Sequence, residues 1–164
     1  MLEKTLSLEK KIGEILSKSD TTLSAAESCT GGMISHAITS VPGASKYYLG
    51  SVTSYAIKIK EKVLGVPAEV IQSNGVVSSE VACAMAEGVK NLMQSTYAVA
   101  TTGLAGPGGD EFNPQGTVWI AVSGPQGTVS HKYIMNGERK ENIELFTHAA
   151  IEMLYDYIRE SIEG

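Results

Sequence analysis

The segment Ser28-Cys29-Thr30-Gly31-Gly32 places a serine hydroxyl in a tight, glycine-rich turn. Residues 21–27 before it are typical of a short buried strand, and residues 33–41 after it are typical of a helix that stops at Pro42-Gly43. A serine at such a junction has an exposed hydroxyl beside unpaired backbone N–H groups, which suits an anion site or an oxyanion hole. The same residues also suit a helix cap formed by Ser28 or Thr30. Local chemistry leaves both interpretations open.

An activated Ser28 needs a base, and lysine is one residue type that can serve. His36, His131 and His148 lie on separate predicted elements, without the spacing of metal ligands, and no Ser-His-Asp set is evident. A lysine acts as a base when burial lowers its pKa enough to leave a neutral amine near neutral pH. Local rules do not choose among the four lysines around the extended segment 47–55, which are Lys46, Lys58, Lys60 and Lys62.

A second glycine-dense segment, residues 103–109, follows the apolar run 97–102, which is typical of a central strand. Ligands of α/β sheets bind where loops leave the carboxyl ends of the strands, so we expect the two glycine segments to share one mouth. Neither segment carries the lysine of a Walker A loop, and Glu111 stands where a third dinucleotide-binding glycine belongs. The sequence therefore predicts no ATP hydrolysis, and we expect neither a metal nor a cofactor.

The hydrophobic periodicity of the sequence predicts the helices and strands that hold the two glycine segments in place. Apolar residues at helical spacing predict a first helix before residue 19, a helix that Ser78 caps, and a closing helix from about residue 138, while residues 117–123 and 128–135 predict a hairpin. Strands that alternate with helices before a late hairpin indicate the α/β class. We expect a single three-layer α/β/α domain over residues 1–164, with a mixed, mostly parallel sheet. The apolar face of the first helix comprises Leu6, Leu8, Ile12, Ile15 and Leu16.

Length and composition exclude several classes of protein. The chain has 164 residues and a formal net charge of −5, which does not suit a general nucleic-acid binder. The cysteines, Cys29 and Cys83, show no pairing motif, and the first residues do not resemble a secretory leader. No stretch approaches the length of a membrane span. We therefore expect a cytoplasmic protein that binds neither nucleic acid nor membrane.

Six segments in order resemble the carboxy-terminal domain of the competence-damage-inducible CinA family, over about residues 5 to 160. In that family the stand-alone domain is a nicotinamide-nucleotide amidase, which converts nicotinamide mononucleotide into nicotinate mononucleotide and ammonia. The resemblance implies a small-molecule nucleotide substrate and a homo-oligomer. The six segments are AESCTGG at 26–32, VPGAS at 41–45, GVP at 65–67, VSSEVA at 77–82, TGLAGPGG at 102–109 and GTVWIA at 116–121.

The same resemblance assigns the catalytic residues. It implies that Ser28 is the nucleophile and that the base is the lysine ending a Tyr-Ser-Asn-x-x-Lys-like segment, which here reads YAIKIK and selects Lys60. Ile57 stands where the family usually has asparagine. This departure motivates an alternative function, a nucleotide-binding or regulatory module without catalysis. Tyr55 and Tyr48 are candidates for a proton relay or a ring contact, although strand packing is the commoner role of tyrosine.

The substrate is expected to contact both glycine segments. The backbone N–H groups of residues 30–32 are candidates for an oxyanion hole and residues 103–109 for the phosphate or ribose, and the two segments can exchange these roles. Arg139, just before the closing helix, is a candidate for the phosphate. The predicted substrate-binding residues are Cys29, Thr30, Gly31, Gly32, Tyr48, Thr102, Gly103, Gly106, Gly108 and Arg139.

Overall fold

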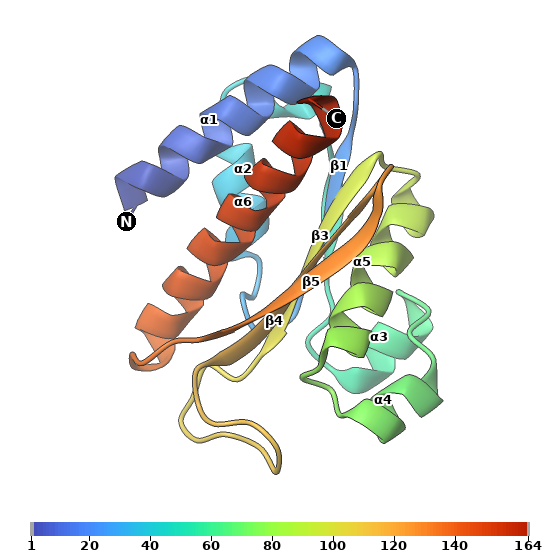
Figure 1. The fold of residues 1–164 in the computed structure, drawn as a ribbon, viewed down its shortest axis with the longest axis vertical. Helices are drawn as coiled ribbons and strands as arrows, with labels where there is room; N and C mark the ends of the chain where they lie inside the picture. Colours follow the sequence, from blue (N-terminus) through green and yellow to red (C-terminus); the bar gives the residue numbers. More distant parts are fainter. Residues whose placement is uncertain (1, 164) are drawn as a thin grey trace.

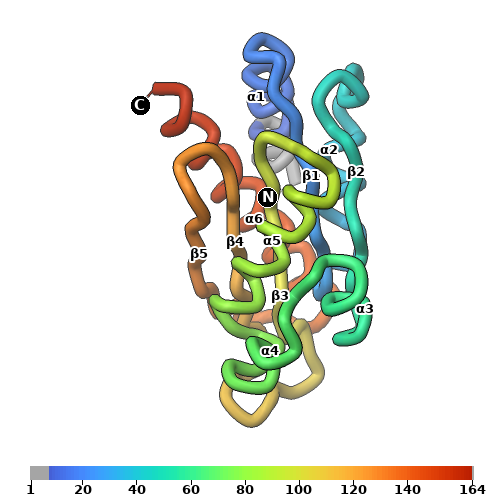
Figure 2. The backbone as a smooth tube through the Cα atoms, turned by 90° about the vertical axis from the view of Figure 1, so that its right-hand side faces the viewer, coloured from blue at the N-terminus to red at the C-terminus, as the bar shows by residue number. Residues whose placement is uncertain are grey.

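The computed structural model describes the backbone of residues 2–163 and the side chains of residues 8–163. Its centre is a five-stranded sheet with the order β2-β1-β3-β4-β5 (Figure 2). β1 runs parallel to β2 and β3, whereas the β3–β4 and β4–β5 pairs are antiparallel. The predicted mixed sheet is confirmed, with two parallel and two antiparallel pairings. The strands are β1 (Leu23–Glu27), β2 (Tyr48–Thr53), β3 (Tyr97–Gly103), β4 (Thr117–Gly124) and β5 (Gly127–Ile134).

Helices cover both faces of the sheet, so the predicted α/β/α layering is confirmed (Figure 1). On one side lie α1 (Leu2–Ser19), α2 (Met33–Thr39) and α6 (Arg139–Glu163), and on the other lie α3 (Ile57–Lys62), α4 (Ala68–Asn74) and α5 (Ser79–Met93). A short 3-10 helix spans Ala44–Lys46. The sequence pattern predicts no helix at α4. No helix within residues 2–163 is long and apolar enough to cross a membrane.

The two helical layers bury different kinds of side chain against the sheet. The layer of α1, α2 and α6 packs larger residues, including Ile12, Leu16 and Phe146, on one face. The α5 face packs the small strand residues Ala98 and Ala100, which let this helix approach closely. The predicted capping of α5 is confirmed, because the Ser78 hydroxyl accepts a hydrogen bond from the Val81 N–H. In the first helix, the predicted apolar face is confirmed at Ile12 and Leu16, which are buried. The side chain of Leu6 lies outside the described residues.

The close packing of α5 also fixes the segment that carries α3. Gly88 of α5 faces the backbone at Leu64, where a Cβ atom on residue 88 would lie 2.1 Å from the Leu64 carbonyl oxygen. The Val66 N–H in turn donates to the carbonyl of Lys60. α3 is therefore held beside the carboxyl end of β1, from which the Ser28 turn leaves.

Candidate active site

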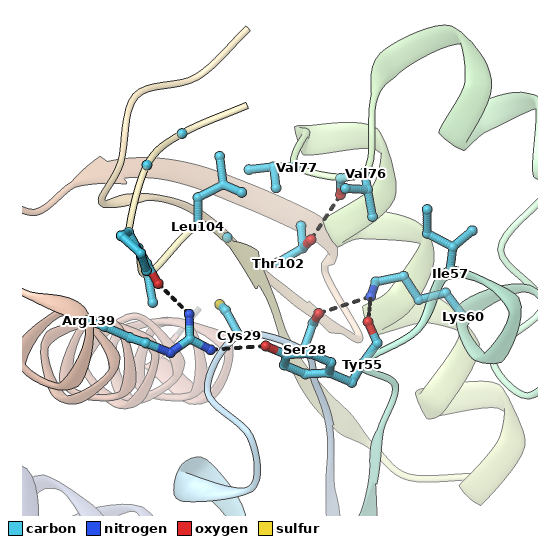
Figure 3. A pocket seen from close by; sticks show the side chains of 16 residues that line it. Ser28, Cys29, Tyr55, Ile57, Lys60, Val76, Val77, Thr102, Leu104 and Arg139 are labelled. Atoms are coloured by element: carbon cyan, nitrogen blue, oxygen red, sulfur yellow. Dashed lines mark hydrogen bonds between the residues drawn. The ribbon is translucent and has the colours of Figure 1, made fainter. Parts of the chain in front are cut away.

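A cavity of about 310 Å³ lies at the carboxyl ends of β1 and β3 (Figure 3). Because these strands are parallel neighbours, the segments that follow them leave the sheet at the same edge. The expectation that the two glycine segments share one mouth is confirmed for Ser28-Cys29 and residues 102–109. The lining residues are Ser28, Cys29, Tyr55, Ile57, Lys60, Val76, Val77, residues 102–109 and Arg139.

Ser28 and Lys60 are in direct contact inside this cavity. The Lys60 Nζ atom lies 2.9 Å from Ser28 Oγ, 2.6 Å from the Ser54 carbonyl oxygen and 3.3 Å from that of Tyr55. A neutral amine has two N–H donors and one lone pair. With its donors on the two carbonyls, the lone pair of neutral Lys60 is left to accept the Ser28 O–H. This arrangement suits proton transfer from the serine to the lysine.

Burial gives Lys60 the electrostatics of a base. Its side chain is only 1% exposed, and it forms no ion pair with a carboxylate of the described residues. Desolvation lowers the pKa of the Lys60 amine from its ordinary 10.5, with a smaller opposing effect from Cys29. Desolvation also raises the pKa of the Cys29 thiol to about 12, so this thiol is neutral at physiological pH and is a poor nucleophile.

The fold separates Lys60 from the other lysines near it. Lys46, Lys58 and Lys62 are exposed, whereas Lys60 lies on the inward face of the short helix α3. Helical geometry turns residues 58 and 62 away from the direction taken by residue 60. Of the four lysines that the sequence alone left open, only Lys60 is buried, which favours it as the base.

Glu27 holds the turn that presents Ser28. Its fully buried carboxylate accepts hydrogen bonds from the Thr30 hydroxyl at 2.7 Å and from three backbone N–H groups, those of Gly32, Ile34 and Ser35. Gly31 and Gly32 have φ angles of 60° and 106°, which favour glycine. The helix cap is therefore the Glu27 carboxylate rather than Ser28 or Thr30, and the Ser28 hydroxyl is left for Lys60.

This cap corrects the prediction that the N–H groups of Gly31 and Gly32 form an oxyanion hole. The N–H of Gly31 donates to the Ser28 carbonyl and that of Gly32 to Glu27, so neither is available to an oxyanion. Thr30, Gly31 and Gly32 do not line the cavity. In the second glycine segment, by contrast, the N–H groups of Ala105 and Gly106 have no hydrogen-bond partner among the described residues. Ala105 and Gly106 line the cavity, which favours the exchanged assignment of roles.

Arg139 and Tyr55 form the other side of the cavity entrance. The Arg139 guanidinium donates to the Tyr55 hydroxyl at 3.0 Å and to the Gly106 carbonyl, and it has no carboxylate partner among the described residues (Figure 3). The Tyr55 side chain is 64% exposed, and its hydroxyl bonds Arg139 rather than Ser28 or Lys60. An unneutralised guanidinium at a cavity mouth suits an anionic group of a ligand.

The remaining predicted residues divide between the cavity and the scaffold. Thr102 lines the cavity and donates from its hydroxyl to the Val76 carbonyl, and Gly108 donates its N–H to the Gln115 side chain. Tyr48 does not line the cavity, and its hydroxyl donates to Ser35 Oγ at 2.9 Å. Its predicted role as a relay or ring contact is therefore not supported. No group of three or more possible metal ligands occurs within the described part of the chain.

Sequence reasoning missed several residues that shape the site. Ser54 supplies the carbonyl closest to Lys60, and Glu27 holds the serine turn. Neither residue has a local pattern that would have revealed its role, because each acts through contacts made after the strands pair. Val76 and Val77 add an apolar wall from the segment before α5.

The fold and the site together define an α/β domain with a buried serine–lysine pair at the ends of its parallel strands. The family model of the CinA C-terminal domain matches residues 5–158, and the chain belongs to this family. It is similar to CinA-like proteins of Salinibacter ruber, 44% identical over 148 residues, and of Flavobacterium psychrophilum, 42% identical over 157 residues. These matches cover 90% and 95% of this chain but only 36% and 38% of the relatives.

Solved structures agree with this assignment. A competence/damage-inducible protein from Agrobacterium tumefaciens is 33% identical, with a TM-score of 0.87 and coverage of 92% of this chain and 93% of its own. A competence or damage-inducible protein from Enterobacter asburiae has a TM-score of 0.91 at 26% identity, with coverage of 94% and 98%. The resemblance predicted from the six ordered segments is therefore confirmed.

Proposed function

We propose that this domain is a serine–lysine amidase that hydrolyses nicotinamide mononucleotide to nicotinate mononucleotide and ammonia. The observation that carries the proposal is the buried contact of 2.9 Å between Lys60 Nζ and Ser28 Oγ. A nucleophile within hydrogen-bond distance of a desolvated base is the arrangement that covalent amide hydrolysis requires. The cavity of about 310 Å³ also falls within the range of small-ligand sites, roughly 300 to 1,000 Å³.

Each step of the reaction has a group on this chain to perform it. Neutral Lys60 takes the hydroxyl proton as Ser28 Oγ forms a bond to the carboxamide carbon. The lysine ammonium then returns the proton to the amide nitrogen, the carbon–nitrogen bond breaks and ammonia leaves. Lys60 next takes a proton from water, whose oxygen attacks the acyl ester, and Ser28 regains its proton as the carboxylate leaves.

Other cavity residues suit the rest of this substrate. The N–H groups of Ala105 and Gly106, which have no hydrogen-bond partner among the described residues, are the candidates to stabilise the oxyanion, a contribution worth roughly 3 to 4 kcal/mol in other hydrolases. The apolar wall of Val76, Val77 and Leu104 suits a planar ring. Arg139 suits the phosphate, because its charge has no carboxylate partner among the described residues.

The test is release of ammonia and nicotinate mononucleotide by the purified protein, compared with its Ser28→Ala and Lys60→Ala variants. We expect both variants to lose at least about 10³-fold in kcat, and the double variant to be no worse, because the two residues act as a unit. Lys62→Ala is the matched control, since Lys62 lies on the same helix but is exposed. Full activity in Ser28→Ala would refute the mechanism.

A binding module without catalysis is the second candidate, and Ile57 favours it. This aliphatic side chain is 47% exposed at the cavity, on the helix that carries Lys60, at the position where the family resemblance implies asparagine. Binding of the mononucleotide by calorimetry without any turnover would support this alternative. Ile57→Asn is then the informative change, and gain of turnover in this variant would assign the lost activity to Ile57.

A further inference from the structure

Asn142 is a buried amide that the proposed chemistry does not use. It lies in the first turn of α6, is 0% exposed and is not one of the residues lining the cavity. Its Nδ2 atom donates to the carbonyls of Ala105 at 3.0 Å and Gly137 at 2.8 Å, and its Oδ1 accepts from the Gly137 N–H at 2.9 Å. Both donors of this side chain and its carbonyl oxygen are thus engaged by the backbone.

These bonds join two segments that form one side of the cavity. Ala105 belongs to the glycine segment, and Gly137 lies two residues before Arg139. Gln115 adds a second amide bridge, because its Nε2 donates to the Gly137 carbonyl at 3.3 Å and its Oε1 accepts from the Gly108 N–H at 2.7 Å. Arg139 itself donates to the Gly106 carbonyl. The glycine segment and the Arg139 turn are therefore held as one unit.

The serine–lysine pair is held by different groups. The Ser54 and Tyr55 carbonyls orient Lys60, and Glu27 orients the Ser28 turn. No hydrogen bond connects Asn142 to any of these residues. Asn142 therefore bonds directly only to the side of the cavity that carries the Arg139 guanidinium, and this side meets the serine–lysine side at the Tyr55 hydroxyl.

We propose that Asn142 is a positioning residue that sets the spacing between Arg139 and the glycine segment, and thereby determines the preference for a phosphorylated substrate. This inference rests on the proposed function and adds to it the residue responsible for phosphate selectivity. The Asn142 side chain donates to the Ala105 carbonyl and bonds both the N–H and the carbonyl of Gly137. These bonds fix the position at which the Arg139 guanidinium meets the substrate anion. Misplacement by about 1 Å through such a support can cost about 10²-fold.

The test compares nicotinamide mononucleotide with the corresponding nucleoside, which lacks the phosphate. Asn142→Asp keeps the size of the side chain but replaces the amide donors with an oxygen that faces two carbonyls. We expect the ratio of kcat/KM for the nucleotide to that for the nucleoside to fall about 10- to 100-fold, mainly through KM for the nucleotide. An unchanged ratio, with both substrates affected equally, would overturn the proposal, because general destabilisation acts on both.

Thr147→Val is the matched control. Thr147 is a buried polar residue of the same helix, and its hydroxyl donates to the Ile143 carbonyl rather than to the cavity segments. We expect this variant to keep the wild-type ratio. If Asn142→Asp fails to fold, Gln115→Met removes the second bridge from a partly exposed position and is expected to lower the ratio in the same direction. A wild-type ratio in a folded Gln115→Met protein would then count against the proposal.

Binding separates this inference from the proposed function. Calorimetry on Ser28→Ala measures the affinity for nucleotide and nucleoside without turnover, and we expect Asn142→Asp in that background to weaken nucleotide binding about 10-fold or more. Combined with Arg139→Gln, Asn142→Asp is expected to add little, because it acts through the guanidinium. Full additivity would overturn the proposal. Absence of turnover in the wild-type protein would refute the amidase and leave this binding test valid.

Discussion

At the residue scale, the site depends on a lysine that is buried without a carboxylate partner. Most buried charges in proteins are paired, because an isolated charge loses its hydration on burial. Lys60 instead has two carbonyls and a serine hydroxyl around its amine. These partners suit a neutral amine, and desolvation of the Lys60 amine outweighs the opposing effect of Cys29 on its pKa.

The lowered pKa of Lys60 predicts the pH dependence of the proposed amidase reaction. Because the base must be neutral, kcat/KM is expected to rise with pH through the lowered pKa of the Lys60 amine and to level off before 10.5. The measurement is a pH–rate profile of the wild-type protein beside Lys60→Ala. The residual rate of Lys60→Ala is expected to lack this rise. A profile that climbs only at 10.5 or above would show that burial does not activate Lys60.

At the scale of elements, the link between β1 and α2 positions Ser28. The strand ends at Glu27, and its carboxylate caps the helix that begins at Met33, so strand, turn and helix share one anchor. Negative charge at a helix N-terminus is favourable, because the first N–H groups of the helix are otherwise unpaired. The anion-binding capacity of this helix end is therefore used by the protein itself.

Glu27→Gln tests this anchor. The substituted amide group presents N–H donors where the carboxylate accepts them, so we expect the free energy of unfolding to fall by about 1.5 to 3 kcal/mol. Urea denaturation measures the change, with the exposed Glu14→Gln as the control. A loss of activity larger than the loss of folded protein is also expected, because the Ser28 turn shifts. Stability within about 0.5 kcal/mol of wild type would contradict the anchoring role.

At the scale of the whole molecule, the layer of α1 and α6 contains a buried carboxyl group, far in sequence from Lys60. Glu9 on α1 is 2% exposed, and neither of its carboxylate oxygens has a hydrogen-bond partner among the described residues. Burial raises the pKa of Glu9 from 4.5 to about 7, and the nearby Tyr47 hydroxyl is also buried without a partner. The packing of α1 is therefore sensitive to pH.

The raised pKa of Glu9 predicts that the free energy of unfolding decreases from acid to neutral pH. The folded protein binds the Glu9 proton more tightly than the unfolded chain, so the free energy of unfolding is expected to fall as pH rises from 4.5 to about 7, and to change little above. Glu9→Gln removes this slope and is expected to raise the melting temperature at pH 8 by about 2 to 4 °C, the equivalent of about 1 kcal/mol. Melting curves from pH 5 to 8 measure both effects. If the melting temperature changes equally with pH in the wild-type protein and in Glu9→Gln, the pH dependence comes from other groups.

The elements of this fold were largely predictable from periodicity, and the misses have a physical cause. The stripe of α5, the late hairpin and the strands before both glycine segments follow from patterns within a few residues. α4 was missed because this short helix has one fully buried residue, Ile71, which leaves no periodic signal. Tyr48 was wrongly placed at the substrate, because strand spacing alone does not say which face meets the cavity.

The sequence by itself determined the order of the strands and of the helices other than α4, the two glycine segments and the serine between β1 and α2, since each depends on neighbouring residues. The resemblance to the CinA family added Lys60, which local rules could not separate from three other lysines. Only the tertiary structure decided that Lys60 is buried against Ser28, that Glu27 engages the N–H groups after the serine, and that Asn142 joins the glycine segment to the Arg139 turn. Burial and long-range hydrogen bonds arise when distant segments pack together, and no local pattern encodes them.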